Sequence, residues 1–375
     1  MKYLSTAIGA ALLTAGVASF ARGAPVVLTK PGATFVQQMQ MGPDGLLCIV
    51  GHVIDPDGDL QPRGTAILFN TKTNKVLWQQ TVDAPDDSAA NRFVACRSDG
   101  KTTYVGANVD THSQRSLAQS LAYVYQFDEK GKITARKELV TGASNSFVYD
   151  LDVDGKAVSV IGKANDTKAD RDVNGIFFAS LDRGLKKATF TQLPTGAFRN
   201  DAVVRLAGNT ALLGGSFSPA AVPKDDVPQD YAVSRIVGGK YQFSVRPQKA
   251  RPRDVATTIT AAHEIVSLGA PGKTTTLTVV GADGKIRDTR EVRSQFCMTS
   301  AMSGNDNSLY AIRSSCARSQ DTPKLVQIDR KTGIETVVTG ISGEPVKVLV
   351  VGDVALVVTE KSDGSLQLQV VGKGA

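Results

Sequence analysis

Apolar and polar residues alternate in short runs along most of this chain, and turn-forming residues separate the runs. The clearest copy reads RFVACR, SDGK and TTYVGANV, followed by SLAYVYQF, DEKG and KITARKELV. Alternation with a period of two, in segments rich in Val, Ile, Thr and Tyr, is typical of β-strands rather than of helices. This stretch therefore predicts a unit of four strands with two tight hairpin turns and one longer loop.

The same order of strands recurs along the chain about every 50 residues. The first strands of the successive units begin near Phe35, Arg92, Phe147, Asp201, Asp254, Cys297 and Val346. Four strands at this period indicate a propeller blade, which buries its two faces only by stacking on its neighbours. The pattern predicts an all-β chain folded as one seven-bladed β-propeller. The alternative is two packed β domains, but no Pro-rich or Ser-rich linker separates the units.

The turns repeat as regularly as the strands. Inner hairpins carry GPDG, SDGK, VDGK, LAGN, GNDN and VGD, whereas the fifth unit has Ala261, Ala262 and His263 at this place. Gly, Asn and Asp provide the positive φ angles that tight hairpins need. Outer hairpins carry NTKTNKVLW, DEKGKITAR, DRGLKKATF, VGGKYQFSV, GADGKIRDT and DRKTGIETV.

These outer hairpins resemble those of pyrroloquinoline-quinone-type and related bacterial propeller repeats, in which a polar turn with Gly and Lys joins the last two strands of a blade. The resemblance covers nearly all of the chain after its first residues. It implies a propeller fold and assigns no activity.

The last unit supplies only three strands, in VKVLVVGD, VALVVTEK and SLQLQVVGK. A sheet edge left open would expose unpaired backbone groups. The segment PVVLTK at residues 25–30 precedes the first full unit and has no partner of its own. We expect this segment to add the missing strand to the last blade and to close the ring.

The first residues have the order of a secretory signal. Lys2 is followed by an uncharged apolar stretch and then by small residues that fit cleavage after Ala21 or Gly23. The stretch also contains Ser, Thr and Gly, which argues against a permanent membrane span, so no transmembrane segment is expected after cleavage. The sequence predicts a signal peptide at residues 1–21, a single propeller domain at residues 25–375, and a periplasmic or secreted location.

Composition narrows the partners without naming one. The chain is 42% hydrophobic and 21% charged, which is typical of a globular protein. Its net charge of +7 permits attraction to anionic partners. No dense Lys run, aromatic stacking motif or helix-turn-helix pattern is present, and an exported protein does not meet nucleic acid, so we expect no nucleic-acid partner.

Four cysteines lie in the propeller, and export would place them where disulfides persist. Cys48 and Cys96 lie near the inner hairpin turns of two adjacent blades, and a disulfide between them is expected to join these blades. In the sixth unit, setting position 303 opposite 308 places Cys297 opposite position 314, two residues from Cys316. We expect a second bridge there. No CxxC motif or paired His supports a metal site instead.

Acidic loops give a partial calcium signal. Asp150, Asp152 and Asp154 spell DxDxDG, but Ile161 stands where the loop needs its last carboxylate. Asp170, Asp172 and Asn174 begin a second incomplete motif, in which Leu181 takes the last ligand position, and Asp55, Asp57 and Asp59 form a third acidic loop. The same positions fit plain hairpin turns or polar loops, so we expect no cofactor, with weak calcium binding by these loops left open.

Catalytic signatures are missing from the pattern. His52, His112 and His263 fall in different units, so the sequence gives no support for a convergent iron site of two His and a carboxylate. GGSFS lacks the spacing of a nucleophile elbow. The sole Trp, Trp78, cannot furnish the aromatic docking motifs of quinoprotein dehydrogenases.

The longest loops join second to third strands, or one blade to the next, and therefore emerge on one face. Basic residues of units four to six gather at this face and could hold a carboxylate or phosphate by forked hydrogen bonds. The candidate ligand-binding residues are the basic side chains Arg246, Lys249, Arg251, Arg253, Arg293, Arg313 and Arg318 on this face, together with Arg199 and Asp201 at the border of the central funnel. The alternative is a solvated basic rim that nearby carboxylates neutralise in part.

Two functions follow from this pattern. The first is an exported binding or scaffold module that recognises an envelope protein or an anionic saccharide through its long-loop face, without catalysis. The alternative is a lyase or hydrolase that acts on an anionic saccharide or phosphoester in the central funnel. We favour the first because no acid, base or metal set is recognisable.

Overall fold

The computed structural model describes residues 24–29, 32–55, 60–85, 88–112, 119–166, 173–193, 198–217, 230–247, 255–269, 274–315 and 322–372. Side chains are described for these residues except at 165–166, 173–174, 193, 198–204, 216–217 and 230. The predicted signal peptide lies outside the described residues and stays a prediction. Within the described part, no helix has the length and apolar character to cross a membrane.

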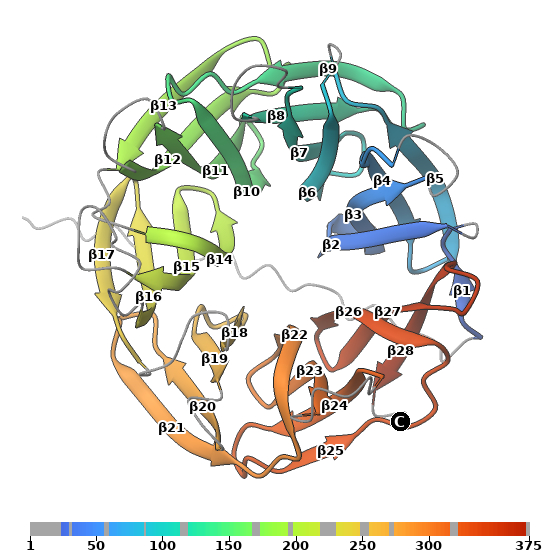
Figure 1. Ribbon diagram of the computed structural model, residues 1–375, viewed down its shortest axis with the longest axis vertical. Helices are drawn as coiled ribbons and strands as arrows, with labels where there is room; N and C mark the ends of the chain where they lie inside the picture. The colour runs from blue at the N-terminus through green and yellow to red at the C-terminus, as the bar shows by residue number, and fades with distance from the viewer. Residues whose placement is uncertain are drawn as a thin grey trace, which may run out of the picture.

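The described strands form seven four-stranded antiparallel sheets, which surround one axis as the blades of a β-propeller (Figure 1). The prediction of the fold is thereby confirmed. Blades one to three contain β2 (Ala33–Met41), β3 (Leu46–Ile54), β4 (Arg63–Asn70), β5 (Lys75–Val82); β6 (Ala90–Ser98), β7 (Thr103–Asp110), β8 (Ser120–Phe127), β9 (Ile133–Glu138); and β10 (Asn145–Val153), β11 (Ala157–Asp166), β12 (Val173–Asp182), β13 (Ala188–Leu193).

The remaining blades repeat this order from the centre outward. Blades four to seven contain β14 (Phe198–Ala207), β15 (Thr210–Phe217), β16 (Asp230–Val237), β17 (Lys240–Val245); β18 (Val255–Ile259), β19 (Ile265–Gly269), β20 (Thr275–Val280), β21 (Ile286–Val292); β22 (Phe296–Gly304), β23 (Ser308–Ser315), β24 (Lys324–Asp329), β25 (Glu335–Val337); and β26 (Glu344–Val351), β27 (Val354–Glu360), β28 (Leu366–Gly372) with β1 (Val26–Val27). The seven predicted first strands coincide with the innermost strands β2, β6, β10, β14, β18, β22 and β26.

Antiparallel pairing sorts the connections onto two faces. The hairpins that join first to second and third to fourth strands emerge on one side, which we call the hairpin-turn face. The connections from second to third strands and from blade to blade emerge on the other side, the long-loop face. Each innermost strand therefore begins at the long-loop face and ends at the hairpin-turn face.

The N-terminal strand closes the ring, as predicted. In the last sheet, Val26 pairs with Leu368 and Val27 with Gln367, so β1 is the outermost strand beside β28. The amide of Leu28 then donates a hydrogen bond of 2.8 Å to the carbonyl oxygen of Leu366. Leu28 is only 3% exposed and joins the apolar cluster between the last and first blades. Sequence-distant ends of the chain thus share one core.

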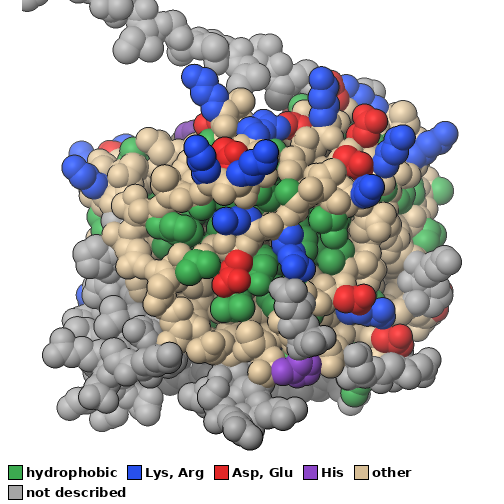
Figure 2. Space-filling model, turned by 90° about the horizontal axis from the view of Figure 1, so that it is seen from above, with side chains coloured by type: hydrophobic (Ala, Val, Ile, Leu, Met, Phe, Trp, Pro, Cys, Tyr) green, Lys and Arg blue, Asp and Glu red, His purple; other side chains and the backbone are tan. Residues whose placement is uncertain are grey.

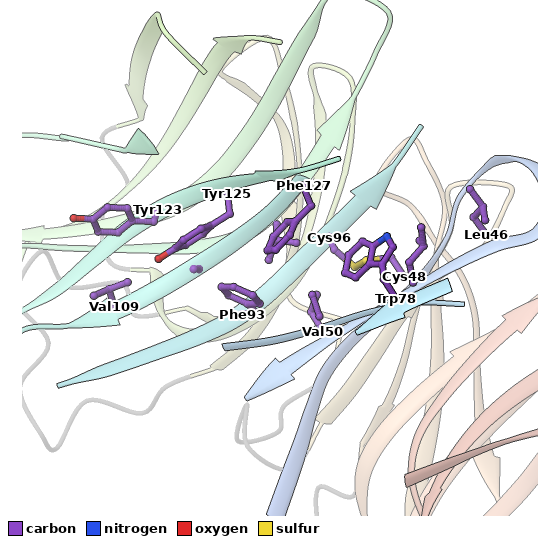
Figure 3. Packing of buried hydrophobic residues seen from close by; sticks show 14 residues of the cluster. Leu46, Cys48, Val50, Trp78, Phe93, Cys96, Val109, Tyr123, Tyr125 and Phe127 are labelled. Carbon is purple, nitrogen blue, oxygen red and sulfur yellow. A yellow bond between two sulfur atoms is a disulfide. The ribbon is translucent and has the colours of Figure 1, made fainter. Parts of the chain in front are cut away.

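An aromatic-rich apolar cluster lies between the first and second blades (Figure 3). Trp78 on β5 stacks on Phe127 of β8, with ring centroids 5.5 Å apart. Phe93 on β6 contacts the same ring edge-on at 6.2 Å. Such aromatic pairs add to the burial of apolar surface that holds neighbouring blades together. The single Trp therefore has a structural position between two blades.

Glycines of two outer hairpins permit a close contact with the preceding blade. Gly131 has φ +80°, and a Cβ built there would lie 2.8 Å from the Trp78 ring. Gly284 has φ +81°, and its Cβ would lie 2.6 Å from the Phe243 ring. A side chain is disfavoured at both places by the backbone and by the neighbouring ring. The Gly in these predicted turns thus has a packing role besides its turn role.

Cys48 on β3 and Cys96 on β6 form a disulfide with Cα atoms 6.3 Å apart, which confirms the predicted staple between blades one and two. The predicted register of the sixth hairpin is wrong at its turn, because Ser303 pairs with Tyr310 rather than with residue 308. At the other end of this hairpin, Phe296 pairs with Ser315 and Met298 with Ser314. A register shift lies between these two pairs, at Cys297. Cys316 lies outside the described residues, so the second bridge stays a prediction.

Candidate functional site

A polar network lies on the innermost strands of the first three blades. The side-chain amide of Gln38 on β2 donates to Asp150 Oδ1 on β10 at 3.0 Å. Its Oε1 accepts from the Cys96 amide on β6 at 2.9 Å. Arg97 Nη2 then donates to Asp150 Oδ2 at 3.1 Å. These side chains join three blades near the axis, where charged groups need internal partners.

The same carboxylates continue the network into the fourth blade. Asp150 Oδ2 accepts from the Leu206 amide at 2.9 Å, and Asp152 Oδ2 accepts from the Gly208 amide at 2.7 Å. The Asp150 side chain is 1% exposed. Removal of one member of such a buried pair leaves the other charge uncompensated, which is strongly destabilising. These two acids therefore fix neighbouring blades to one another.

The DxDxDG motif is a structural element. Its third acid, Asp154, accepts from the backbone amides of Lys156 and Ala157 at 2.8 Å, and these bonds lower the pKa of its carboxyl group. Asp150 and Asp152 have the inter-blade partners given above. Among the described residues, no group of three or more His, Cys, Asp or Glu could hold a metal ion.

The other acidic loops provide no test of calcium binding. Asp55 is described, and its carboxylate lies 3.5 Å from Arg63 Nη2. Asp57, Asp59, Asp170 and Asp172, with the side chain of Asn174, lie outside the described residues. Calcium binding by these loops stays a prediction.

Two large apolar side chains on innermost strands are exposed close to the long-loop face. Phe35 is the third residue of β2 and is 48% exposed. Met298 is the third residue of β22 and is 65% exposed. Both strands begin at the long-loop face, and these residues are near their first ends. The two side chains therefore lie at the long-loop end of the axis. Apolar side chains exposed at this end of the axis are available for contact with a binding partner.

His52 supports the exposed Phe35 ring. The two residues pair across β2 and β3, and their rings stack with centroids 4.9 Å apart and planes 16° apart. Burial, and to a smaller extent the charge of Arg92, lower the pKa of His52. A neutral imidazole is compatible with stacking on Phe35 because it needs no counter-charge. The second aromatic ring fixes the orientation of the first.

The opposite face carries mixed charge. Its turns include the exposed residues Lys101, Lys130 and Lys156, whose backbone amides donate hydrogen bonds to an Asp carboxylate of the same turn. Figure 2 shows blue Lys and Arg side chains interspersed with red Asp and Glu along one edge of the disc. Interspersed charges of both signs give a solvated surface rather than a field of one sign.

The residues predicted to bind an anion are only partly described. Arg246 and Arg293 are exposed. The side chains of Arg199 and Asp201, and the residues Lys249, Arg251, Arg253 and Arg318, lie outside the described part. The anion-binding cluster therefore stays a prediction.

Arg313 was predicted to lie in a basic cluster at the long-loop face, but the structure places it in the interior. Its guanidinium is fully buried and forms an ion pair with Glu335. It also donates to Ser294 Oγ at 2.7 Å, Thr275 Oγ1 at 3.0 Å and the Phe296 carbonyl at 2.7 Å. These partners belong to blades five and six, so Arg313 serves the packing between blades. The rigid planar donors of Arg suit such a buried junction.

Sequence reasoning missed several residues of these sites. Arg97 looks like an ordinary strand-end charge, and the sequence marks Asp150 only as part of an incomplete calcium motif, because no linear signal shows that distant strands meet at one axis. Phe35 was used only to mark where a strand begins. Its position at the start of an innermost strand was the available signal for an exposed ring near the axis.

Comparison with solved structures supports the fold. The chain is similar to the β-propeller domain of the Trilobed protease from Pyrococcus furiosus, described as having an open velcro topology, with TM-score 0.54 and 10% identity over 92% of this chain and 96% of that one. It is also similar to the Pyrococcus horikoshii acylaminoacyl peptidase, with TM-score 0.53 and 9% identity over 90% of this chain. This match spans 51% of the peptidase.

At these identities the likeness shows the seven-bladed propeller fold alone. No protein-family model matches the sequence. No curated protein matches it either.

Proposed function

We propose that this protein is an exported binding or scaffold module that recognises a protein partner through the axial end of its long-loop face. The observation that carries the proposal is the exposure of Phe35 and Met298 on two innermost strands. Aromatic and Met side chains are enriched at protein interfaces, and Met adapts to partners of different shape. The fold places both side chains at one end of the axis.

Export is supported by the disulfide and by the first residues. Cys48 and Cys96 are 1% and 0% exposed, so the bridge is part of the core between two blades. Structural disulfides of this kind persist in oxidising compartments. The proposed signal peptide would deliver the chain to such a compartment.

Positive charge at the same face would add steering rather than the main affinity. Arg246 and Arg293 are exposed there, and the predicted cluster includes four further basic residues outside the described part. Rim charges raise association rates and make binding sensitive to salt. An envelope protein with an apolar segment beside carboxylates fits this surface, and an anionic saccharide fits the basic residues alone.

The alternative of a lyase or hydrolase has weaker support. The titratable groups described on the innermost strands include Arg97, Asp150 and Asp152, and all three are engaged in bonds between blades. A general acid or base must instead reach the substrate. We therefore prefer binding to catalysis for this propeller.

The experiment compares two double variants as bait in extracts of the producing cells. Phe35→Ser with Met298→Ser removes the axial apolar groups. Ile133→Ser with Ile286→Ser removes apolar groups that are also exposed, at 38% and 51%, but lie on outermost strands. Proteins retained by the wild type and by the outer variant, but lost from the axial variant, support the proposal.

Purified candidates are then measured by titration calorimetry, where loss of an interface anchor should weaken binding by about 2 kcal/mol, roughly thirtyfold. Binding that is equal in the two variants would overturn the role of the axial surface. For the basic residues, retention on an anionic polysaccharide column should fall with salt and with Arg251→Ala and Arg253→Ala.

A further inference from the structure

Lys347 is a partly buried cation in the innermost strand of the last blade, and among the described residues it has no hydrogen-bond or ion-pair partner. It stands between Val346 and Val348 in an apolar strand. Burial alone lowers the pKa of its ammonium group, without a carboxylate nearby to oppose the effect. An ammonium group in such a place is costly unless a counter-charge accompanies it.

Packing shows which side of the blade Lys347 occupies. Val348 and Val350 belong to the apolar cluster shared with the sixth blade. Val346 and Leu349 pack instead with the cluster shared by the last and first blades. Successive side chains of a strand point to opposite faces, so Lys347 lies on the side of Leu349 and faces the first blade. This is the junction at which the ring closes.

The matched positions of blades one and three carry acceptors, whereas those of blades two and six carry the apolar residues Ala95 and Met298. Gln38 in β2, Asp150 in β10 and Lys347 in β26 are each the first residue to pair after a register shift in an innermost strand. Gln38 accepts from the Cys96 amide of the next blade, and Asp150 accepts from an amide of its own next blade. A Lys ammonium group can only donate. The last junction therefore has a donor where two other junctions have an acceptor.

We propose that Lys347 is the centre of an oxyanion-binding site at the junction of the last and first blades, near the axis. The ligand is a small free anion that bears a carboxylate or phosphate group. Its oxygen atoms supply both the missing counter-charge and the missing acceptor. Charge-assisted hydrogen bonds of this type are about twice as strong as neutral ones. The site is independent of the proposed partner surface, because its side chains differ from Phe35 and Met298.

The test uses the full mature chain with inorganic phosphate and acetate as probes and chloride as the reference, at constant ionic strength and pH 7. Lys347→Met removes the charge and keeps the side-chain length, whereas Lys347→Gln restores an acceptor like that of Gln38. Lys101→Met, in an exposed turn, is the control. Melting temperature and titration calorimetry are measured for each, and circular dichroism establishes that each is folded.

The wild type and the Lys101 variant should bind at least one probe and melt at a higher temperature with it than in chloride. Both Lys347 variants should bind roughly tenfold or more weakly and lose the differential rise. Phosphate alone as the effective probe assigns a phosphate-type ligand, and acetate alone assigns a carboxylate. Equal responses in all four proteins, or no response in the wild type, would overturn the proposal. If Lys347→Met fails to fold, Lys347→Gln decides in the same way.

Discussion

Asp150→Asn is the most informative single change in the axial network. The carboxylate is buried and accepts from Gln38, Arg97 and the Leu206 amide, which belong to three other blades. The Asn side chain loses the charge that compensates Arg97 and presents an amide donor to groups that are themselves donors. Breaking a buried pair in this way costs about 3 to 5 kcal/mol in the free energy of unfolding.

The matched control is Asp154→Asn in the same DxDxDG motif. Asp154 is exposed and accepts only from amides of its own turn, a task that Asn performs nearly as well. We expect this control to cost less than about 1 kcal/mol. Urea unfolding at 25 °C, with and without calcium, measures both changes. Trp78 fluorescence reports the transition because this sole Trp lies between the first two blades.

Equal, small losses in the two variants would refute the structural account of Asp150. Calcium that stabilises the wild type but neither variant would instead favour the ion-binding interpretation of the motif. The network account predicts that calcium leaves the difference between the variants unchanged.

Three further changes test other parts of the fold. Burial lowers the pKa of His52 below 6.5, so the unfolded chain binds more protons than the folded chain as the pH falls. The wild type should therefore lose stability relative to His52→Phe between about pH 7 and pH 5. Parallel curves of unfolding free energy against pH would contradict this. Replacing both Cys48 and Cys96 by Ala opens a loop with sequence separation 48 and should cost about 4 kcal/mol, measured by denaturation without reductant. Gly131→Ala should lower the free energy of unfolding by about 1 to 3 kcal/mol more than Gly100→Ala, because both glycines have positive φ but only Gly131 faces a ring. Equal melting temperatures of the two variants would show that the contact with Trp78 does not contribute.

The fold could be predicted because its information is local and repeated. Each strand shows a period of two, and each hairpin carries turn residues at a fixed place in the unit. The place of the N-terminal strand could be predicted from the number of strands, since the last unit contains only three and PVVLTK has no partner in its own unit. The staple between Cys48 and Cys96 followed from their positions in adjacent units.

The sites could not be predicted to the same degree, because they depend on which strands meet at the axis. Asp150 has its partners in blades one, two and four, and no linear spacing encodes that convergence. Arg313 was placed at the surface because it stands near the end of a strand beside a long loop. In fact Glu335, from the outermost strand of the same blade, turns this Arg inward. The predicted register of the sixth hairpin was wrong because β22 contains bulges, and each bulge shifts the pairing by one residue.

Deletion of residues 24–29 tests the central claim that the two ends of the chain close one ring of seven blades. Thermal unfolding of this variant is compared with that of a chain that begins at residue 24, and with Leu28→Ser and Val27→Ser in the complete strand. Because Leu28 is 3% exposed and Val27 is 53% exposed, the account predicts a large fall in melting temperature for the deletion, a clear fall for Leu28→Ser, and little change for Val27→Ser. A deletion variant that melts at the same temperature as the chain from residue 24 would contradict the closure of the ring by β1.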